Sequence, residues 1–197
     1  MQGEPTPAYR PIVGAVLCGG RSSRFGSDKA LADAGGRLLG QTVVDALREA
    51  LVDPVVAIGG SAGPTLGLPT VPDLRPGDGP LGGLATALLW AKTGPVVVVP
   101  CDLVLLQAAH IEAVVAAARR HEGHVVVATV LGEPQVSLAC WPAERGREVL
   151  KLLDAGKRRF YDALDQPEWV GVELPADAIS DADTPEDLER ILNRPAG

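Results

Sequence analysis

The sequence has little cysteine and few aromatic residues, and it lacks long apolar runs. Its three cysteines, Cys18, Cys101 and Cys140, are odd in number and show no C-x-x-C spacing, which argues against a disulfide framework or a zinc ribbon. We expect all three to be buried as small hydrophobic residues. No apolar run approaches a membrane-spanning length, and residues 1–11 lack the apolar core of a signal peptide. We therefore expect no membrane contact and a cytoplasmic protein.

Positive charge is also scarce. The formal net charge is −7, from 18 lysines and arginines against 25 acidic residues, so a nucleic-acid partner is not expected. Apolar residues make up 46% of 197 residues, which is enough for one buried core. No internal repeat or linker divides the chain. We expect a flexible tail over residues 1–10 and a single domain over residues 11–197.

Two common phosphate-binding motifs are missing where they would be expected. The apolar run at residues 11–18 ends at Gly19 and Gly20, but Lys29 does not follow a glycine as in the P-loop, and no G-x-G-x-x-G is present here. The loop nevertheless combines glycines, whose backbone N–H groups can approach a ligand, with the cations Arg21, Arg24 and Lys29. Backbone donors together with Arg and Lys suit a polyphosphate, whose charge is spread over several oxygens. A basic surface loop is the alternative.

Apolar periodicity predicts strands that alternate with helices. This order favours a three-layer, Rossmann-like α/β fold: a mostly parallel sheet with helices on both faces. Residues 124–131 and 136–141 form a hairpin-like pair that predicts a small antiparallel addition. The other expected strands are residues 12–17, 55–58, 70–73, 95–99 and 169–174, and the expected helices are residues 39–51, 84–92, 107–121 and 142–153, with a last helix capped by Thr184.

Two aspartates follow expected strands, at the sheet edge where ligands of open α/β folds bind. Asp102 comes after the valine-rich run 95–99 and is either a helix N-cap or a ligand for a hard cation. Asp73 precedes a Gly- and Pro-rich segment. Its carboxylate could accept hydrogen bonds from N1 and N2 of guanine, or it could simply begin a turn.

The loop after the first strand resembles the signature L-x-G-G-x-x-x-R-x-G-x-D-K of sugar-nucleotide and cofactor nucleotidyltransferases. In detail the chain is similar to the molybdenum cofactor guanylyltransferases, and the similar motifs occur in the same order over residues 13–192. The signature positions here are Leu17, Gly19, Gly20, Arg24, Gly26, Asp28, Lys29, Ala30 and Leu31. The resemblance implies a nucleotide-diphospho-sugar transferase-like fold.

The resemblance also implies site residues. It gives Arg24, Lys29 and Asp102 catalytic roles, and it assigns Mg²⁺ to Asp102 and Asp183. It places the acceptor near Gln135, Arg158, Arg159 and Asp181. The nucleotide-binding positions that it implies are Leu17, Cys18, Gly19, Gly20, Lys29, Gly59, Asp73, Gly79, Pro80, Leu81, Gly83 and Asp102.

This chain departs from the family pattern at several of these places. Asp181 and Asp183 stand where the pattern has asparagines, and Val136 follows Gln135 where relatives often have proline. Cys18 replaces the usual alanine, and Phe25 replaces methionine. The resemblance alone therefore leaves open whether Asp183 helps to place Mg²⁺ and whether Asp181 meets the acceptor.

The activity that the resemblance implies is transfer of GMP from GTP to the terminal phosphate of Mo-molybdopterin, with Mg²⁺ as cofactor and pyrophosphate as the leaving group. Proteins of molybdenum insertion and molybdoenzyme maturation are the implied partners. A phosphate acceptor is already ionised at neutral pH, so catalysis needs positioning and electrostatics rather than a protein nucleophile. The alternatives are a CTP-dependent or sugar-1-phosphate nucleotidyltransferase, a non-catalytic nucleotide- or cofactor-binding module, and a Rossmann-type oxidoreductase.

Overall fold

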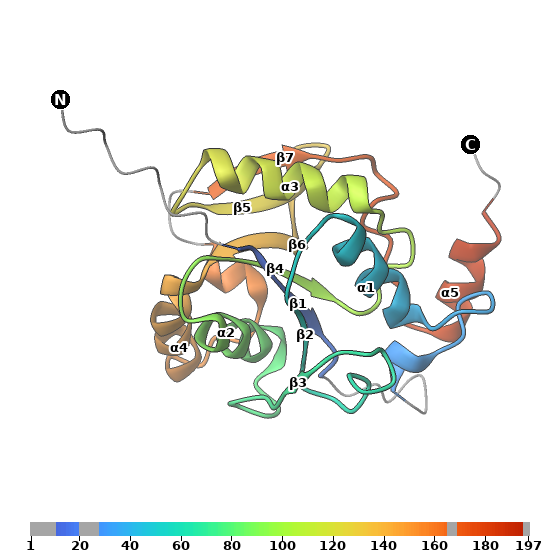
Figure 1. Cartoon of the computed structure of the whole chain (residues 1–197), viewed down its shortest axis with the longest axis horizontal. Coiled ribbons are helices and arrows are strands. Elements are labelled where there is room, and N and C mark those ends of the chain that lie inside the picture. Colours follow the sequence, from blue (N-terminus) through green and yellow to red (C-terminus); the bar gives the residue numbers. More distant parts are fainter. Residues whose placement is uncertain (1–10, 20–27, 165–168, 195–197) are drawn as a thin grey trace.

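The computed structural model describes residues 11–19, 28–164 and 169–194. Its centre is a seven-stranded sheet in the order β3-β2-β1-β4-β6-β5-β7 (Figure 1). The strands are β1 (Val13–Leu17), β2 (Val55–Ile58), β3 (Thr70–Val71), β4 (Pro95–Pro100), β5 (Val125–Val130), β6 (Glu133–Pro142) and β7 (Trp169–Glu173).

Helices fill most of the connections between these strands. The α-helices are α1 (Leu39–Glu49), α2 (Gly79–Ala91), α3 (Ala108–Arg120), α4 (Gly146–Asp154) and α5 (Pro185–Leu192). Short 3₁₀ helices are η1 (Lys29–Leu31), η2 (Ala143–Arg145) and η3 (Phe160–Ala163). The predicted α/β architecture is confirmed. So is the start of α5, where the Thr184 side chain accepts a hydrogen bond from the Asp187 backbone N–H.

Six of the strands run in one direction and β6 runs against them. β1 pairs in parallel with β2 and β4, while β6 is antiparallel to both β4 and β5. The antiparallel hairpin was expected, but its second strand lies inside the sheet and not at its margin. β7 pairs in parallel with β5 and forms one edge of the sheet; its apolar and polar residues alternate, which is typical of an edge strand.

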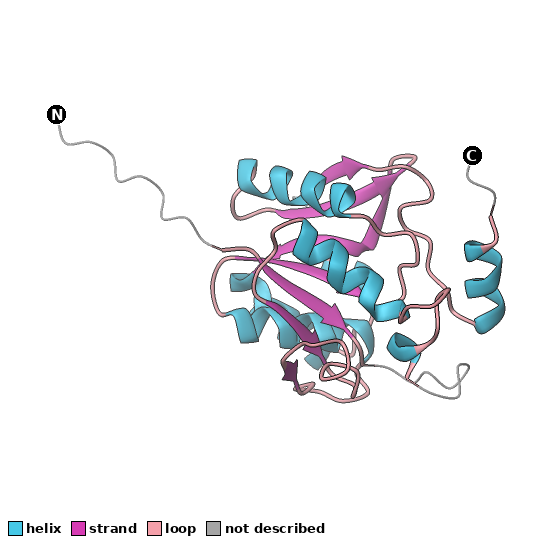
Figure 2. Cartoon of the chain, turned by 45° about the vertical axis from the view of Figure 1, so that its right-hand side comes forward, coloured by secondary structure: helices cyan, strands magenta, loops and turns pink. Residues whose placement is uncertain are grey.

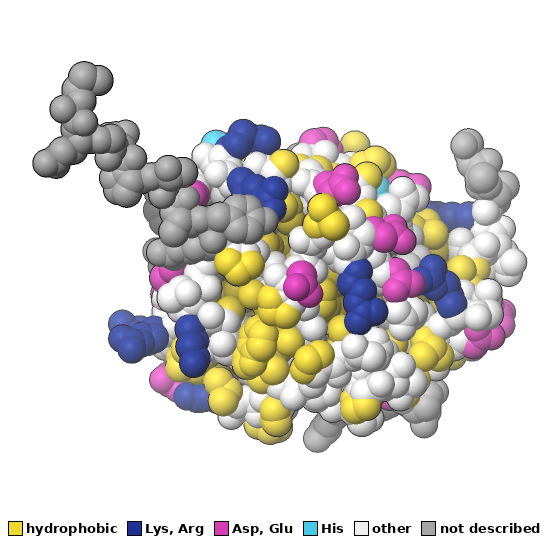
Figure 3. Space-filling model, in the orientation of Figure 1, with side chains coloured by type: hydrophobic (Ala, Val, Ile, Leu, Met, Phe, Trp, Pro, Cys, Tyr) yellow, Lys and Arg dark blue, Asp and Glu magenta, His cyan; other side chains and the backbone are white. Residues whose placement is uncertain are grey.

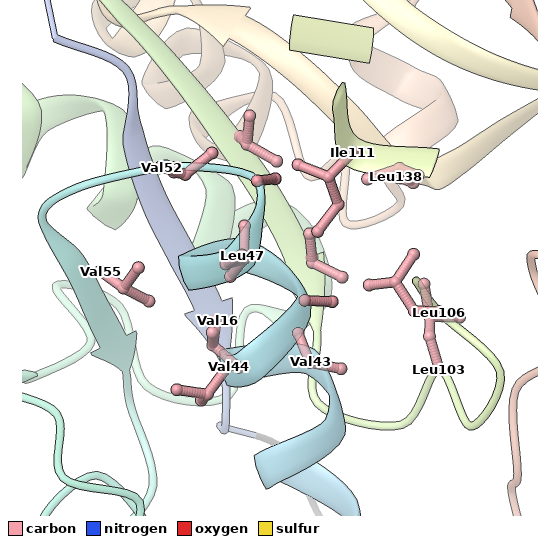
Figure 4. Packing of buried hydrophobic residues seen from close by; sticks show 14 of the residues in the cluster. Val16, Val43, Val44, Leu47, Val52, Val55, Leu103, Leu106, Ile111 and Leu138 are labelled. Carbon is pink, nitrogen blue, oxygen red and sulfur yellow. The ribbon is translucent and has the colours of Figure 1, made fainter. Parts of the chain in front are cut away.

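The sheet is covered on both faces, because successive side chains of its strands point to opposite sides. In β4, Val97 and Val99 belong to a core shared with α1 and α3, whereas Val96 and Val98 belong to a core shared with α2 and α4. The helices accordingly lie on both sides of the strands (Figure 2). Figure 4 shows the first core, where Leu47 of α1 lies near β1 and β4.

A third, smaller apolar cluster holds the C-terminal helix beside the loop before α1. Leu188 and Ile191 of α5 pack with Ala34, Leu39 and two residues of the site region, Val104 and Ala182. Figures 1 and 2 both show α5 at the side of the molecule, next to η1 and the start of α1. The cluster therefore ties the end of the chain to the segment that follows β4.

Several element boundaries differ from expectation. Helix α4 begins at Gly146 and not at residue 142, because residues 143–145 form the 3₁₀ helix η2. Helix α2 begins at Gly79 and not at residue 84, because Pro80 occupies the first turn, where a missing N–H costs nothing. Strand β6 begins at Glu133 and not at residue 136, because the turn between it and β5 needs only Leu131 and Gly132. All three cysteines are free and buried, as predicted.

The surface carries mixed charge. On the face in Figure 3, the described lysine and arginine side chains stand apart in small groups, with acidic side chains among them, and they form no continuous basic surface. None of the helices in the described ranges combines the length and the hydropathy needed to cross a bilayer.

Candidate active site

The candidate site lies at the carboxyl ends of β1 and β4. The chain goes from β1 to β2 on one side and later returns to β4 on the other side of β1. Such a reversal of strand order opens a crevice for ligands at the carboxyl ends of the strands. Lys29, in the turn that follows the loop after β1, and Asp102, just after β4, meet at this crevice.

Lys29 links two carboxylates across the crevice. Its Nζ lies 2.6 Å from Oδ2 of Asp102 and 3.1 Å from Oδ1 of Asp183. Burial lowers the pKa of Lys29, but its hydrogen bonds and charge interactions with Asp102 and Asp183 outweigh burial and raise the pKa above its ordinary 10.5. Lys29 is therefore a fully charged ammonium at neutral pH.

Asp28 fixes the turn that carries Lys29. Its Oδ1 accepts a hydrogen bond from the Ala30 backbone N–H at 3.2 Å, which begins η1. Its Oδ2 accepts from the hydroxyl of Ser61 at 3.2 Å and from the Ser61 backbone N–H at 3.4 Å. The Lys29 turn is thereby bound to the loop that follows β2.

Asp183 reaches the site because its segment pairs with the one after β4. Leu103 and Asp181 form an antiparallel bridge, the Val104 N–H donates to the Ser180 carbonyl at 2.9 Å, and the Ala182 N–H donates to the Asp102 carbonyl at 3.2 Å. Residues 76 to 80 positions apart in the sequence thus lie side by side. The Asp183 side chain remains 63% exposed, while that of Asp102 is 17% exposed.

The residues present suit a divalent cation that is shared with a nucleotide. The second carboxylate oxygen of Asp102, Oδ1, is buried and has no hydrogen-bond partner among the described residues. Burial raises the pKa of Asp102 above its ordinary value, and the hydrogen bond from Lys29 opposes that shift. A hard divalent cation that takes its other ligands from phosphate oxygens and water needs only one or two carboxylates, and Asp102 and Asp183 supply two.

The loops after β1 and β2 meet around Asp73, which follows β3. A Cβ built on Gly19 would lie 2.7 Å from Asp73 Oδ2, and one built on Gly59 would overlap the same carboxylate. Gly59 also has a φ of +66°, which side chains rarely adopt. Burial raises the pKa of Asp73. The glycines after β1 and β2 therefore make room for a carboxylate between the two loops.

Several of the expected nucleotide-binding residues could contact a ligand only through backbone atoms, because their side chains are buried. Leu17, Cys18 and Leu81 have buried side chains, and Leu81 is fully buried in the core under α2. A Cβ on Gly83 would lie 3.2 Å from Leu17 Cδ2, so the start of α2 packs closely on the end of β1. Cys101 lies beside Cys18, and the hydrogen bond between them and burial raise the pKa of Cys101 well above its ordinary value.

The first turn of α2 is tied to the basic segment after α4. The Leu81 N–H donates to the Arg158 carbonyl at 3.2 Å, and the Arg158 guanidinium lies 3.1 Å from Asp78 Oδ1. That guanidinium also donates to the Leu153 carbonyl at 2.8 Å. Gly79 has a φ of +70°, and a Cβ there would lie 3.2 Å from the Arg158 carbonyl. Arg158 therefore holds the Gly79–Pro80–Leu81 turn in place.

The other acceptor-side residues lie at the start of β6 and nearby. Gln135 pairs with Ala128 near the carboxyl end of β5. Tyr161 joins this strand to η3, because its hydroxyl donates to the Pro134 carbonyl at 2.7 Å. Nη2 of Arg159 lies 3.7 Å from Oδ1 of Asp162, and the Arg159 side chain is 80% exposed, so its positive charge is accessible from solvent. Asp181 is exposed and stands beside Leu103.

Two expected site residues, Gly20 and Arg24, lie outside the described residues. Sequence reasoning missed three that shape the site, namely Ser61, Asp78 and Tyr161. Asp78 was part of the Gly- and Pro-rich segment, but nothing in the sequence indicated its pairing with Arg158, 80 positions away. Ser61 and Tyr161 gave no signal, because a lone serine in a loop and a lone tyrosine in a turn fit many roles.

Comparison with known proteins identifies the family. The MobA-like NTP transferase domain family matches residues 14–168. A molybdenum cofactor guanylyltransferase of Mesorhizobium japonicum is 34% identical over 182 residues, which cover 84% of each chain.

Solved structures share the fold. The molybdopterin-guanine dinucleotide biosynthesis protein A of Archaeoglobus fulgidus superposes with a TM-score of 0.72 at 20% identity, over 91% of this chain and 96% of its own. A manganese complex of Rv0371C from Mycobacterium tuberculosis gives 0.70 at 16% identity, over 93% and 98%. From the match over residues 14–168 and the 34% identical relative, we conclude that this chain is a nucleotidyltransferase and belongs to the MobA-like NTP transferase family.

Proposed function

We propose that this chain transfers GMP from GTP to the terminal phosphate of Mo-molybdopterin and so forms molybdopterin guanine dinucleotide. The observation that carries the proposal is the position of Lys29 Nζ, between Asp102 and Asp183 at the carboxyl ends of β1 and β4. A triphosphate and its metal require a cation and carboxylates at one place. The relative's name, molybdenum cofactor guanylyltransferase, supports the choice of donor and acceptor.

In the proposed reaction, a terminal phosphate oxygen of the acceptor attacks the α-phosphorus of GTP in line with the leaving group. A bond forms between that oxygen and the α-phosphorus, and the bond from the α-phosphorus to the oxygen that bridges to the β-phosphorus breaks. The bonding electrons leave with pyrophosphate. The acceptor oxygen is already ionised, so no protein base has to remove a proton.

The chain's own task is to hold these groups in line and to balance their charge. Lys29 donates to the α-phosphate and to the departing pyrophosphate, with Arg24 as its partner. Gly19 lacks a side chain, so its backbone can approach the phosphates closely. Because Asp28 binds the Lys29 turn to Ser61, the ammonium is aimed before the substrate arrives.

Asp102 and Asp183 are the residues that would hold Mg²⁺. When bound, the ion neutralises charge on the phosphate oxygens. The buried, unpartnered Oδ1 of Asp102 supports this assignment, since a carboxylate oxygen without a donor gains from a cation.

Asp73 is the residue proposed to recognise the guanine base. A carboxylate can accept hydrogen bonds from both N1–H and the 2-amino group of guanine, which cytosine and adenine do not offer in that arrangement. Gly19 and Gly59 leave room for this carboxylate beside the crevice. Guanine would then lie beside the loops after β1 and β2, with its N1–H and 2-amino group toward the carboxylate after β3.

The acceptor would lie on the other side of the crevice, toward Gln135, Arg159 and Asp181. The exposed guanidinium of Arg159 suits the acceptor's phosphate. Arg158 is bound to Asp78 and acts through the turn at Gly79–Leu81.

A pyrophosphate-release assay with a nucleotide panel tests the proposal. The protein is mixed with Mo-molybdopterin, Mg²⁺ and GTP, CTP, ATP or UTP, with EDTA as the metal-free control. The proposal expects release that needs the acceptor and the metal, is fastest with GTP, and is accompanied by the guanine dinucleotide in mass spectrometry.

Other outcomes would point to the alternatives. A preference for CTP would make the chain a cytidylyltransferase, and release with a sugar 1-phosphate in place of the pterin would change the acceptor. Tight GTP binding with no pyrophosphate release would indicate a non-catalytic module.

A further inference from the structure

The Lys29 ammonium lies between the two carboxylates proposed to hold Mg²⁺. Lys29 Nζ lies 2.6 Å from Asp102 and 3.1 Å from Asp183, and the Lys29 side chain is only 13% exposed. These distances are those of charge-assisted hydrogen bonds. The chain itself thus places one positive charge between the two carboxylates.

The spacing of the two carboxylates does not depend on Lys29. The Ala182 N–H bonds to the Asp102 carbonyl and the Val104 N–H bonds to the Ser180 carbonyl, so the backbone fixes Asp183 relative to Asp102. Ala182 is fully buried against Leu188 and Ile191 of α5. The two carboxylates would therefore stay close to each other if the ammonium left, and their repulsion would have to be balanced by another cation.

Lys29 can leave because only its flexible side chain has to move. Its backbone is fixed by the Asp28 and Ser61 contacts, whereas the four-carbon stem can turn the ammonium toward a new anion. A divalent ion placed beside the ammonium would be repelled by it, since two cations within a few ångströms destabilise each other. The triphosphate provides the anion that would draw Lys29 away.

We propose that Asp183 is a positioning residue that, together with Asp102, holds Lys29 in the place of the divalent cation until the nucleotide binds. Lys29 would then turn toward the phosphates, and both carboxylates, including the unpartnered Oδ1 of Asp102, would be left to hold the metal. This inference rests on the proposed nucleotidyl transfer, and it adds an order of binding in which the nucleotide binds before the metal. Metal binding to the free protein is weak, and the nucleotide makes it strong.

The asparagines of the family pattern would give a different result at this position. An amide in place of the Asp183 carboxylate would bind both cations less well, since it has no net charge. The aspartate of this chain therefore strengthens the hold on Lys29 in the free state and on the metal in the bound state.

The test measures Mn²⁺ binding to the full chain by electron paramagnetic resonance. Wild type is compared with Lys29→Met, Asp183→Asn and the double variant, all without nucleotide. Lys29→Met removes the competing charge, so it should bind Mn²⁺ at least about tenfold more tightly than wild type. The double variant should lose that gain. Lys151→Met, exposed on α4, is the matched control and should bind like wild type.

A second arm adds a non-hydrolysable GTP analogue. Water-proton relaxation separates Mn²⁺ on the protein from Mn²⁺ on free nucleotide, and wild type should now bind Mn²⁺ at least about as tightly as Lys29→Met does alone. Circular dichroism and thermal unfolding check each fold, and Lys29→Gln replaces Lys29→Met if the latter does not fold.

Two results would overturn this proposal: Lys29→Met binding Mn²⁺ no more tightly than wild type, or wild type binding it equally well with and without nucleotide. Failure of the proposed reaction is seen separately, as absence of pyrophosphate release by wild type.

Discussion

The carboxylate of Asp73 occupies the space that a side chain at Gly59 would need, and it closely approaches Gly19 as well. Three loops, after β1, β2 and β3, therefore converge on one acidic group. Asp73 is not an isolated turn residue in this structure, because two glycines from other strands leave room for it.

Substituting Gly19 by alanine should weaken nucleotide binding without unfolding the protein. The new Cβ would lie 2.7 Å from Asp73 Oδ2, and the carboxylate, at the end of a flexible side chain, would shift away. We expect the KM for GTP to rise about tenfold with kcat nearly unchanged. In an Asp73→Ala background the same substitution should add little. Equal effects in both backgrounds would mean that Gly19 acts independently of Asp73.

Substituting Asp73 by asparagine should reduce the discrimination between GTP and ITP, which lacks the 2-amino group. Loss of a charged acceptor costs about 1.5–3 kcal/mol, so kcat/KM for GTP should fall about 10- to 100-fold. The ratio of kcat/KM for GTP to that for ITP should move toward one. An unchanged ratio would assign base recognition to another residue.

Substituting Lys29 by alanine should lower kcat by about two to three orders of magnitude, because the ammonium balances charge that develops in the transition state. Lys151→Met, on the exposed surface of α4, should retain wild-type kcat. Steady-state pyrophosphate release measures both, and thermal unfolding shows whether the fold persists. Near-normal turnover of Lys29→Ala would remove Lys29 from the mechanism.

Glu173 should stabilise the β5–β6 turn in a pH-dependent way. Its carboxylate accepts hydrogen bonds from the Thr129 hydroxyl at 2.7 Å and the Leu131 N–H at 2.6 Å. These hydrogen bonds lower the pKa of Glu173 below its ordinary 4.5, and the bond from Thr129 contributes most. Since the folded-state pKa is the lower one, the stabilisation is complete above the unfolded-state pKa and disappears as the pH falls through the folded-state pKa.

Thermal unfolding of Glu173→Gln from pH 3 to 7, in comparison with wild type, measures this effect. The difference in Tm should be largest near neutral pH and should shrink below about pH 4.5. Glu122→Gln, on the exposed surface after α3, is the control for simple loss of charge. A Tm difference that stays constant with pH would contradict the role of the Glu173 carboxylate.

Substituting Leu131 by asparagine should stabilise the protein. Leu131 has a φ of +53° and is 88% exposed, in a two-residue hairpin turn completed by Gly132. Asparagine tolerates this conformation far better than leucine, so unfolding should cost up to about 1 kcal/mol more. Leu192→Asn, at a partly exposed position in α5, should give no such gain. A lower Tm for Leu131→Asn would show that the Leu131 side chain makes a contact that stabilises the folded protein.

Much of the fold was predictable because local patterns determine it. The valines of β4 are buried on both faces, and Thr184 and Pro185 mark the start of α5. The position of β6 was not predictable, since a hairpin sequence indicates its turn but not the neighbour on its far side.

The site divides in the same way. Lys29 and Asp102 come after strands of the sheet, so the rule for open α/β sheets predicts that they lie at the same edge. No local pattern indicates their direct contact. The position of Asp183 depends on the pairing of residues 180–182 with residues 102–104, which no local pattern indicates either. Arg158 could not be separated from Arg159 by sequence, because two adjacent arginines look alike until one of them meets Asp78.

The reversed direction of β6 also affects how this enzyme can change over evolution. Because β6 is antiparallel to β4 and β5, its first residues and the Leu131–Gly132 turn lie at the edge of the sheet where those two strands have their carboxyl ends. Insertions in that hairpin would alter the proposed acceptor side of the sheet edge while leaving β1 and β4 in place. The proposed acceptor side can thus vary without a change in the residues proposed to act on the nucleotide.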